Sequence, residues 1–199
     1  YSLVSIMRNP NYISKFNLIK LSIPILLANL VVPLVGLVDT VLMGHLGSEK
    51  FLTAISISTT FMTMIFWSFG FLRMGTVGLV SQALGKGDYR EIVSITVRNI
   101  SIALILSLLI ILLKNPIILI IDLIFKPEEY TSTLINSYIS IRVFSAPAEL
   151  IIYVLIGFYL GLQKTRTSSL IVIFFSIANI YFSIFFVQNM GLEIKGVVL

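Results

Sequence analysis

The segment Val31–Gly47, "VVPLVGLVDTVLMGHLG", is almost entirely apolar, yet an aspartate, Asp39, lies in its middle. A helix that crosses a membrane needs about 20 consecutive apolar residues, and this segment with its apolar flanks supplies them. An ionisable acid inside such a helix is costly, and its usual explanation is a function. The segment therefore bears on both the fold and the activity of the chain.

The composition of the whole chain indicates a membrane protein. Of its 199 residues, 57% are hydrophobic and only 12% are charged, and the mean hydropathy is +1.03. A soluble domain is usually about one quarter charged. So many apolar side chains do not fit inside one globular core, and we expect the lipid bilayer to surround them.

Five apolar segments are long enough to cross a bilayer as helices, and a sixth begins near Gly196. Helices satisfy their own backbone hydrogen bonds, which lipid demands. The segments lack the alternation of polar and apolar residues that membrane β-strands show. We therefore expect an all-α membrane protein, with residues 1–199 forming one transmembrane lobe. Its expected helices are residues 18–46, 52–84, 93–113, 133–162 and 168–187, with the start of a sixth from residue 196.

The connections between these segments alternate in charge. The N-terminal end and every second connection are basic, whereas the others are about neutral. Because basic connections stay on the cytoplasmic side, we expect a multi-pass protein of the inner (plasma) membrane with a cytoplasmic N-terminus. The basic residues that carry this pattern are Arg8, Lys15, Lys20, Lys86, Arg90, Lys164 and Arg166.

Several classes of function are excluded by what the sequence lacks. It contains no Cys, and its one histidine, His45, cannot build a metal site alone. The net charge of +5 is not gathered in one patch, so we expect no nucleic-acid partner. The connections are too short to hold a soluble active site. We expect neither an enzyme nor a bound cofactor or metal.

Three polar residues inside the apolar segments are candidates for a functional site. Asp39 must face a water-lined cavity or take up a proton, and a carboxyl group that gains and loses a proton can couple two processes. A structural hydrogen bond to a neighbouring helix is the alternative. Asn179 and Ser183 stand one turn apart on one helix face. They either line the cavity that receives Asp39 or join two helices by hydrogen bonds.

Prolines and glycines mark positions where helices bend or approach closely. Pro24 and Pro33 interrupt the first segment, where a proline removes one helical hydrogen bond and bends the helix. Such a bend is either static or part of a transport cycle. Gly157 and Gly161 form a GxxxG pattern, which permits close packing of two helices.

Charged residues within the segments are expected to serve packing and anchoring. Arg142 and Glu149 are seven residues apart, which is too far for a simple contact within one helix. We expect each of them to reach another helix or the membrane interface. Arg73 and Arg98 are expected to anchor helix ends at the cytoplasmic surface.

Four stretches of the sequence resemble, in order, helices and loops of the multidrug and toxin extrusion (MATE) transporters. The resemblance is to the DNA-damage-inducible F (DinF-like) branch and covers nearly the whole chain. The stretches are Ser22–Gly47 ("SIPILLANLVVPLVGLVDTVLMGHLG"), Phe71–Glu91 ("FLRMGTVGLVSQALGKGDYRE"), Ile141–Ser169 ("IRVFSAPAELIIYVLIGFYLGLQKTRTSS") and Asn179–Leu199 ("NIYFSIFFVQNMGLEIKGVVL").

The resemblance implies a twelve-helix fold of two six-helix bundles. It also implies a secondary active antiporter that exports organic, often cationic, drugs and xenobiotics in exchange for a proton or a sodium ion. This chain would be the N-terminal bundle, and the C-terminal six-helix half would be its missing partner. The chain begins with Tyr1 rather than Met and ends in the apolar run "GVVL", so we expect a fragment.

The resemblance also assigns roles to individual residues. Asp39 matches the acid of the family's first helix and is expected to be the protonatable coupling residue. Asn179 matches an asparagine of the same cation-coupling site, and Pro24 matches the proline at which the first helix bends. Ser183 stands where many relatives carry an aspartate. That departure leaves Asp39 as the one acid of the expected site.

Two alternatives stay open. The chain could be a non-transporting or vestigial half-transporter module, because a half bundle exposes a face meant for its partner half. A membrane-embedded, lipid-modifying enzyme is the other alternative. It would need at least two convergent catalytic groups, and the sequence offers no Ser–His pair or carboxylate dyad within one segment.

Overall fold

The fold is a bundle of helices connected by short turns. The computed structural model describes residues 23, 26, 30, 41 and 49–190, and these include no β-strand. Its elements from residue 49 onward are α3 (Glu49–Ser68), α4 (Phe71–Lys86), α5 (Tyr89–Leu112), α6 (Lys114–Phe125), α7 (Glu129–Arg142), the 3₁₀ helix η2 (Val143–Ser145), α8 (Ala146–Gly161) and α9 (Thr165–Met190).

Three stretches of the described residues are long and apolar enough to cross a membrane. They are Leu52–Lys86, Tyr89–Leu112 and Glu129–Gly161. Two of them combine successive helices, α3 with α4 and α7 with η2 and α8. The prediction of an all-α membrane protein is confirmed, and two of its apolar segments are interrupted helices.

Prolines account for the interruption between α5 and α6 and for the interruption between α7 and α8. A proline ring inside a helix clashes with the carbonyl group four residues earlier. Pro116 stands four residues after Leu112, where α5 ends, and Pro147 stands four residues after Val143, where η2 begins. The α3–α4 interruption falls at Phe69 and Gly70, and glycine is a poor helix former.

Helix termini differ from the expected boundaries where a local capping group extends or stops the helix. The α5 helix begins at Tyr89, four residues before the expected start. The Asp88 side chain caps it by accepting a hydrogen bond from the Glu91 backbone N–H at 2.9 Å. The preceding α4 helix ends at Lys86 and is capped by Gly87, which adopts a left-handed conformation with φ +72°.

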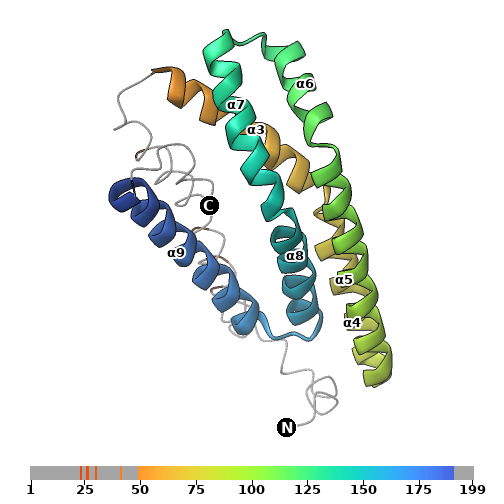
Figure 1. The fold of residues 1–199 in the computed structure, drawn as a ribbon. Coiled ribbons are helices and arrows are strands. Elements are labelled where there is room, and N and C mark those ends of the chain that lie inside the picture. Colours follow the sequence, from red (N-terminus) through yellow and green to blue (C-terminus); the bar gives the residue numbers. More distant parts are fainter. Residues whose placement is uncertain (1–22, 24–25, 27–29, 31–40, 42–48, 191–199) are drawn as a thin grey trace.

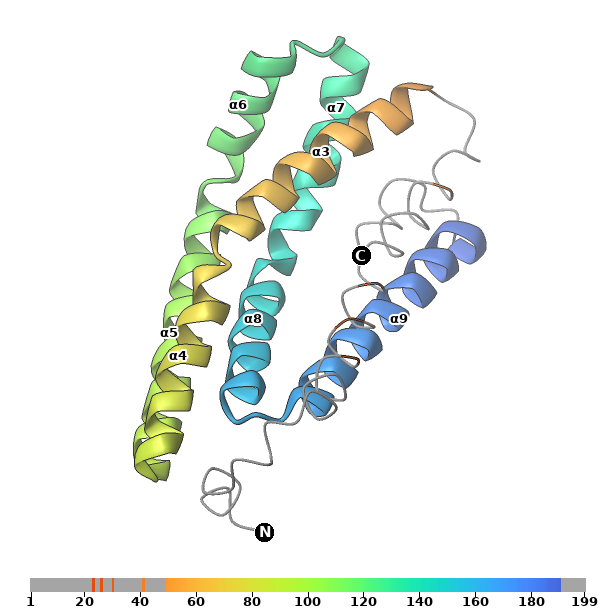
Figure 2. The ribbon, with the colours of Figure 1, turned by 180° about the vertical axis from the view of Figure 1, so that it is seen from behind.

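The helices pack around one main apolar core, α4 antiparallel to α5 and parallel to α8. The α4 helix packs against α5 and α8, α3 packs against α7, and α9 contacts α8. Figures 1 and 2 show that α9 meets α8 near the turn that joins them and diverges from α7 farther along. The largest fully buried apolar side chains of the core are Met62, Ile121, Ile135, Ile139 and Leu150.

The α8 and α4 helices approach each other closely at two glycines. A Cβ atom placed on Gly157 would lie 2.7 Å from the Arg73 carbonyl oxygen and 2.8 Å from the Thr76 Cβ. A Cβ on Gly161 would lie 2.7 Å from the Val80 Cβ. The two glycines therefore let the helices meet at distances that no other residue permits, as the GxxxG pattern predicts.

An ion pair outside the apolar spans joins the start of α3 to the α6–α7 connection. Lys50, in the first turn of α3, donates to Glu128, in the α6–α7 connection, at 2.6 Å. The hydrogen bond from Lys50 and its positive charge lower the pKa of the fully exposed Glu128 carboxyl group. Pairs this exposed contribute little to stability.

Candidate functional site

The predicted cation-coupling residues fall only partly within the described chain. Asp39 and Pro24 lie outside the described residues. Asn179 lies on α9, and its side chain is exposed. Ser183 belongs to the same helix one turn later, and its side chain lies outside the described part. The structure therefore places one of the predicted side chains and does not test the grouping of all four.

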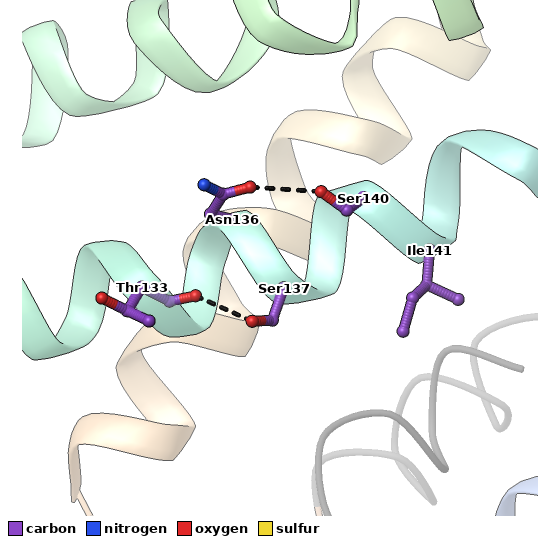
Figure 3. A pocket seen from close by; sticks show the side chains of 5 residues that line it. All are labelled: Thr133, Asn136, Ser137, Ser140 and Ile141. Atoms are coloured by element: carbon purple, nitrogen blue, oxygen red, sulfur yellow. Dashed lines mark hydrogen bonds between the residues drawn. The ribbon is translucent and has the colours of Figure 1, made fainter.

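The described residues contain a polar groove on one face of α7. A pocket of about 410 Å³ is lined by Thr133, Asn136, Ser137, Ser140 and Ile141. These residues follow the helical spacing i, i+3, i+4, i+7 and i+8, so they share one face. Figure 3 shows their side chains along that face. The face is opposite to the one that buries Ile135 and Ile139.

Hydrogen bonds within α7 satisfy part of this groove. The Ser137 hydroxyl donates to the Thr133 carbonyl oxygen at 3.0 Å, and the Ser140 hydroxyl donates to the Asn136 side-chain oxygen at 3.1 Å. The Asn136 amide nitrogen donates to no described residue and is exposed. The groove thus offers neutral donors and acceptors inside an apolar span. Such a face requires water, a ligand or another helix.

A second set of polar side chains lies at the junction of α7 and α8. The Arg142 guanidinium donates to the Glu149 carboxylate at 2.9 Å and lies 5.5 Å from the centre of the buried Phe66 ring. Both charged side chains are partly buried, with 26% and 30% exposed. The ion pair spans η2, from the last turn of α7 to the first turn of α8.

The expectation that Arg142 and Glu149 do not contact each other is wrong. It assumed one continuous helix, in which seven residues separate two positions by about 10.5 Å along the axis. The 3₁₀ turn at Val143–Ser145 breaks that register. Both side chains are also long enough for their polar ends to meet across the break.

Arg73 does not lie at the helix end where it was expected. It belongs to the first turn of α4, next to the interruption at Gly70, whereas the α4–α5 turn follows Lys86. Its backbone meets α8, because a Cβ on Gly157 would lie 2.7 Å from the Arg73 carbonyl oxygen. Arg73, like Arg142 and Glu149, thus lies near the middle of an apolar span.

The α7 groove was missed in the sequence, although the signal was present. The run "TLINSYIS", Thr133–Ser140, places four polar residues on one face of an otherwise apolar segment. No pattern in the sequence indicates that Arg73 lies next to α8, because this depends on how α4 packs against α8. Among the described residues there is no group of three or more His, Cys, Asp or Glu that could hold a metal ion.

Comparison with known proteins assigns the chain to a family. The MatE family model matches residues 24–185. DNA damage-inducible protein F of Escherichia coli (strain K12) is 34% identical over 179 residues, which are 90% of this chain and 39% of that protein. Multidrug resistance protein NorM of Aliivibrio fischeri is 29% identical over 155 residues, which are 77% of this chain and 33% of that protein.

Solved structures share the fold. A MATE protein crystallised in complex with MaD5 superposes with a TM-score of 0.82 at 21% identity, covering 89% of this chain and 40% of that one. A MOP superfamily transporter from Pyrococcus furiosus gives a TM-score of 0.80 at 22% identity, covering 90% of this chain and 40% of that one. The chain spans between one third and two fifths of the length of these relatives. The family match over most of its residues shows that the chain belongs to the MatE family of multidrug and toxin extrusion transporters, whose members are not enzymes.

Proposed function

We propose that this chain forms the N-terminal lobe of an antiporter that exports organic, often cationic, compounds in exchange for a proton or a sodium ion. The observation that carries the proposal is the MatE match over residues 24–185, together with the helical bundle common to solved MATE proteins. The similarity to a relative named for multidrug resistance supports export of xenobiotic molecules.

The described helices offer a physical basis for a bundle that alternates between two arrangements of its helices. Two apolar spans are interrupted near their middle, at Gly70 and at Val143–Ser145. Interrupted helices near the membrane midplane are a common feature of transporter binding sites. A ligand shifts the balance between two packings only by its difference in affinity for them. The polar groove of α7, which contains Asn136 and Ser140, is a surface that such a change would uncover or cover.

Asp39 is the proposed coupling residue. A carboxylate enclosed by helices is costly in its charged form and much less costly once protonated. Protonation of Asp39 would therefore change its hydrogen-bond partners and favour a different packing of the first helix, which Pro24 allows to bend. Release of the proton would restore the first packing. The cavity that holds the substrate would differ between the two states.

Asn179 and Ser183 complete the proposed cation-coupling site. The exposure of Asn179 on α9 supports this role, because its amide is accessible to a partner. Ser183 supplies at most a neutral oxygen where many relatives carry an aspartate. A site with the single acid Asp39 fits one proton more readily than a sodium ion, which prefers several oxygen ligands. No cofactor is needed for this exchange.

The proposed setting is the inner (plasma) membrane, with a cytoplasmic N-terminus and a second six-helix half as partner. Large apolar side chains that the described bundle leaves exposed support a lipid or helix partner, among them Met64, Trp67, Leu112 and Phe174. Alone, the chain is not expected to transport.

The test is efflux of ethidium, an organic cation, from cells that make the intact protein. We expect Asp39→Asn to abolish efflux driven by a proton gradient, whereas Asp39→Glu retains part of it. The matched control is Asp122→Asn on α6, where Asp122 accepts a hydrogen bond from Ser132 at 3.0 Å and the amide oxygen can still do so. Efflux that survives Asp39→Asn with unchanged cation dependence would remove the coupling role.

A further inference from the structure

The first half of α5 carries a row of polar side chains on the face that points away from the bundle. The helix packs against α4 and α8 through buried residues that include Ile92, Asn99 and Ala103. Figures 1 and 2 show α5 at the edge of the bundle. On the opposite side of the helix, the spacing i, i+4, i+8 and i+11 aligns four exposed polar residues. These residues, which we refer to as the α5 polar stripe, are Arg90, Ser94, Arg98 and Ser101.

Arg98 lies inside the apolar span Tyr89–Leu112. Because α5 begins at Tyr89, Arg98 belongs to its third turn and not to the helix end expected from the sequence. The next charged residue along the chain is Lys114. An apolar core about 30 Å thick corresponds to about 20 helical residues. Counted back from Lys114, that core begins near Ser94, and Arg98 lies about 6 Å inside it. An arginine at this depth reaches the headgroup region by extending its side chain along the helix.

No described residue neutralises the two arginines of the α5 polar stripe. Arg90 and Arg98 are exposed, and neither forms an ion pair or a hydrogen bond with another described residue. Glu91, the one carboxylate of α5, lies 3.9 Å from the Lys86 ammonium group. A charged arginine within an apolar span is costly without a counter-charge. The stripe therefore fits an anion that reaches it from the surrounding lipid.

An anionic phospholipid has the charge and the shape that fit this face. Arginine binds phosphate oxygens through two parallel hydrogen bonds, and the exposed Ser94 hydroxyl between the two arginines can donate one more. Beyond the stripe, the same face continues with Ile105, Leu108 and Leu112, whose exposed fractions are 56–70%. Acyl chains pack along such an apolar surface. The face is thus ordered as a phospholipid is, with the phosphate near the basic end and the chains toward the middle of the membrane.

We propose that the α5 polar stripe binds the phosphate group of an anionic phospholipid, with Arg98 as the main contact and the acyl chains along the apolar half of α5. The lipid is a lasting partner of the outer face of the bundle and not a transported substrate, because this face points away from α4 and α8. The inference goes beyond the proposed export function and does not depend on it.

The test is the quenching of an introduced tryptophan by brominated lipids, with the intact protein in bilayers. Ile105→Trp places the reporter one turn beyond the stripe on the same exposed face. The signal is the difference from the protein without this substitution. It is compared between bilayers that contain equal shares of dibrominated phosphatidylglycerol or dibrominated phosphatidylcholine. We expect phosphatidylglycerol to occupy the position about five-fold more favourably.

The arginine variants are made in the protein that carries Ile105→Trp. Arg98→Gln should make the two lipids quench equally, whereas Arg98→Lys should keep part of the preference because it retains the charge. The matched control is Arg166→Gln, which removes an exposed arginine from the first turn of α9, at the same end of the molecule but on a different helix. It should leave the preference for phosphatidylglycerol unchanged.

Equal quenching by the two lipids before any arginine is changed would overturn the proposal, whether or not the arginine variants fold. An equal loss with Arg166→Gln would also overturn it, because the preference would then come from the general charge of that end. Weak quenching by both lipids would show that protein covers this face, either a second copy or the other half of the transporter, and would overturn it as well. Efflux is not measured, so the outcome is separate from the proposed export.

Discussion

Gly157 holds α8 against α4 because it carries no Cβ. In Gly157→Ala the new methyl group would meet the Arg73 carbonyl oxygen at 2.7 Å and the Thr76 Cβ at 2.8 Å. A backbone carbonyl cannot move aside without shifting its helix, so we expect a loss of about 1–3 kcal/mol of stability. The measurement is the midpoint of thermal unfolding of the intact protein in detergent.

The control for this substitution is Gly75→Ala on α4. A Cβ at Gly75 would meet nothing within 4 Å. Alanine is favoured over glycine inside a helix by roughly 0.5–1 kcal/mol, so this variant should be as stable as the original protein or more stable. If Gly157→Ala and Gly75→Ala changed the unfolding midpoint equally, the close packing of α8 on α4 would not depend on Gly157.

At the scale of elements, a buried hydrogen bond joins α4 to α5. The Asn99 amide donates to the Thr76 hydroxyl at 2.8 Å, and that hydroxyl donates to the Leu72 carbonyl oxygen at 2.6 Å. Thr76→Val keeps the shape but leaves the Asn99 amide unpaired. We expect a loss of roughly 0.6–2 kcal/mol, measured as unfolding of the intact protein in detergent.

Thr96→Val is the matched control, because Thr96 bonds only to the Ile92 carbonyl oxygen of its own helix, at 2.8 Å. It should be nearly neutral. Adding Asn99→Leu to Thr76→Val removes the second polar group and should restore part of the loss. A control variant as unstable as Thr76→Val would show that the α4–α5 bond contributes nothing of its own.

The elements themselves were more predictable than their interruptions. Apolar length and the absence of alternation were enough to predict helices and a membrane protein, because these depend on composition and local period. Pro116 and Pro147 do not mark the breaks directly. Each break begins four residues before the proline, at the carbonyl group with which the proline ring would clash. The Arg142–Glu149 contact was predicted wrongly because a continuous helix was assumed.

At the scale of the whole molecule, the site was only partly predictable. Gly157 and Gly161 indicated close packing, but not which helix they pack against. Only the packing of α8 on α4 brings Gly157 against Arg73 and Thr76. Contacts of this kind join residues far apart in the sequence, and no local pattern encodes them. The roles of Asp39 and Ser183 stay predictions.

The orientation of the bundle is the last prediction. Figure 1 shows the α4–α5 and α8–α9 turns at one end of the molecule and the α6–α7 connection at the other. The first end carries Lys86, Arg90, Lys164 and Arg166, so it should face the cytoplasm. The chain itself has no cysteine, so an introduced cysteine is its one site of labelling. In intact cells, a membrane-impermeant maleimide should label Glu129→Cys, at the start of α7, and should label Gly85→Cys, in the last turn of α4, only after permeabilisation. Both positions are exposed, so access to the reagent decides the result. The opposite pattern would invert the topology and place the basic end outside, against the charge asymmetry from which it is derived.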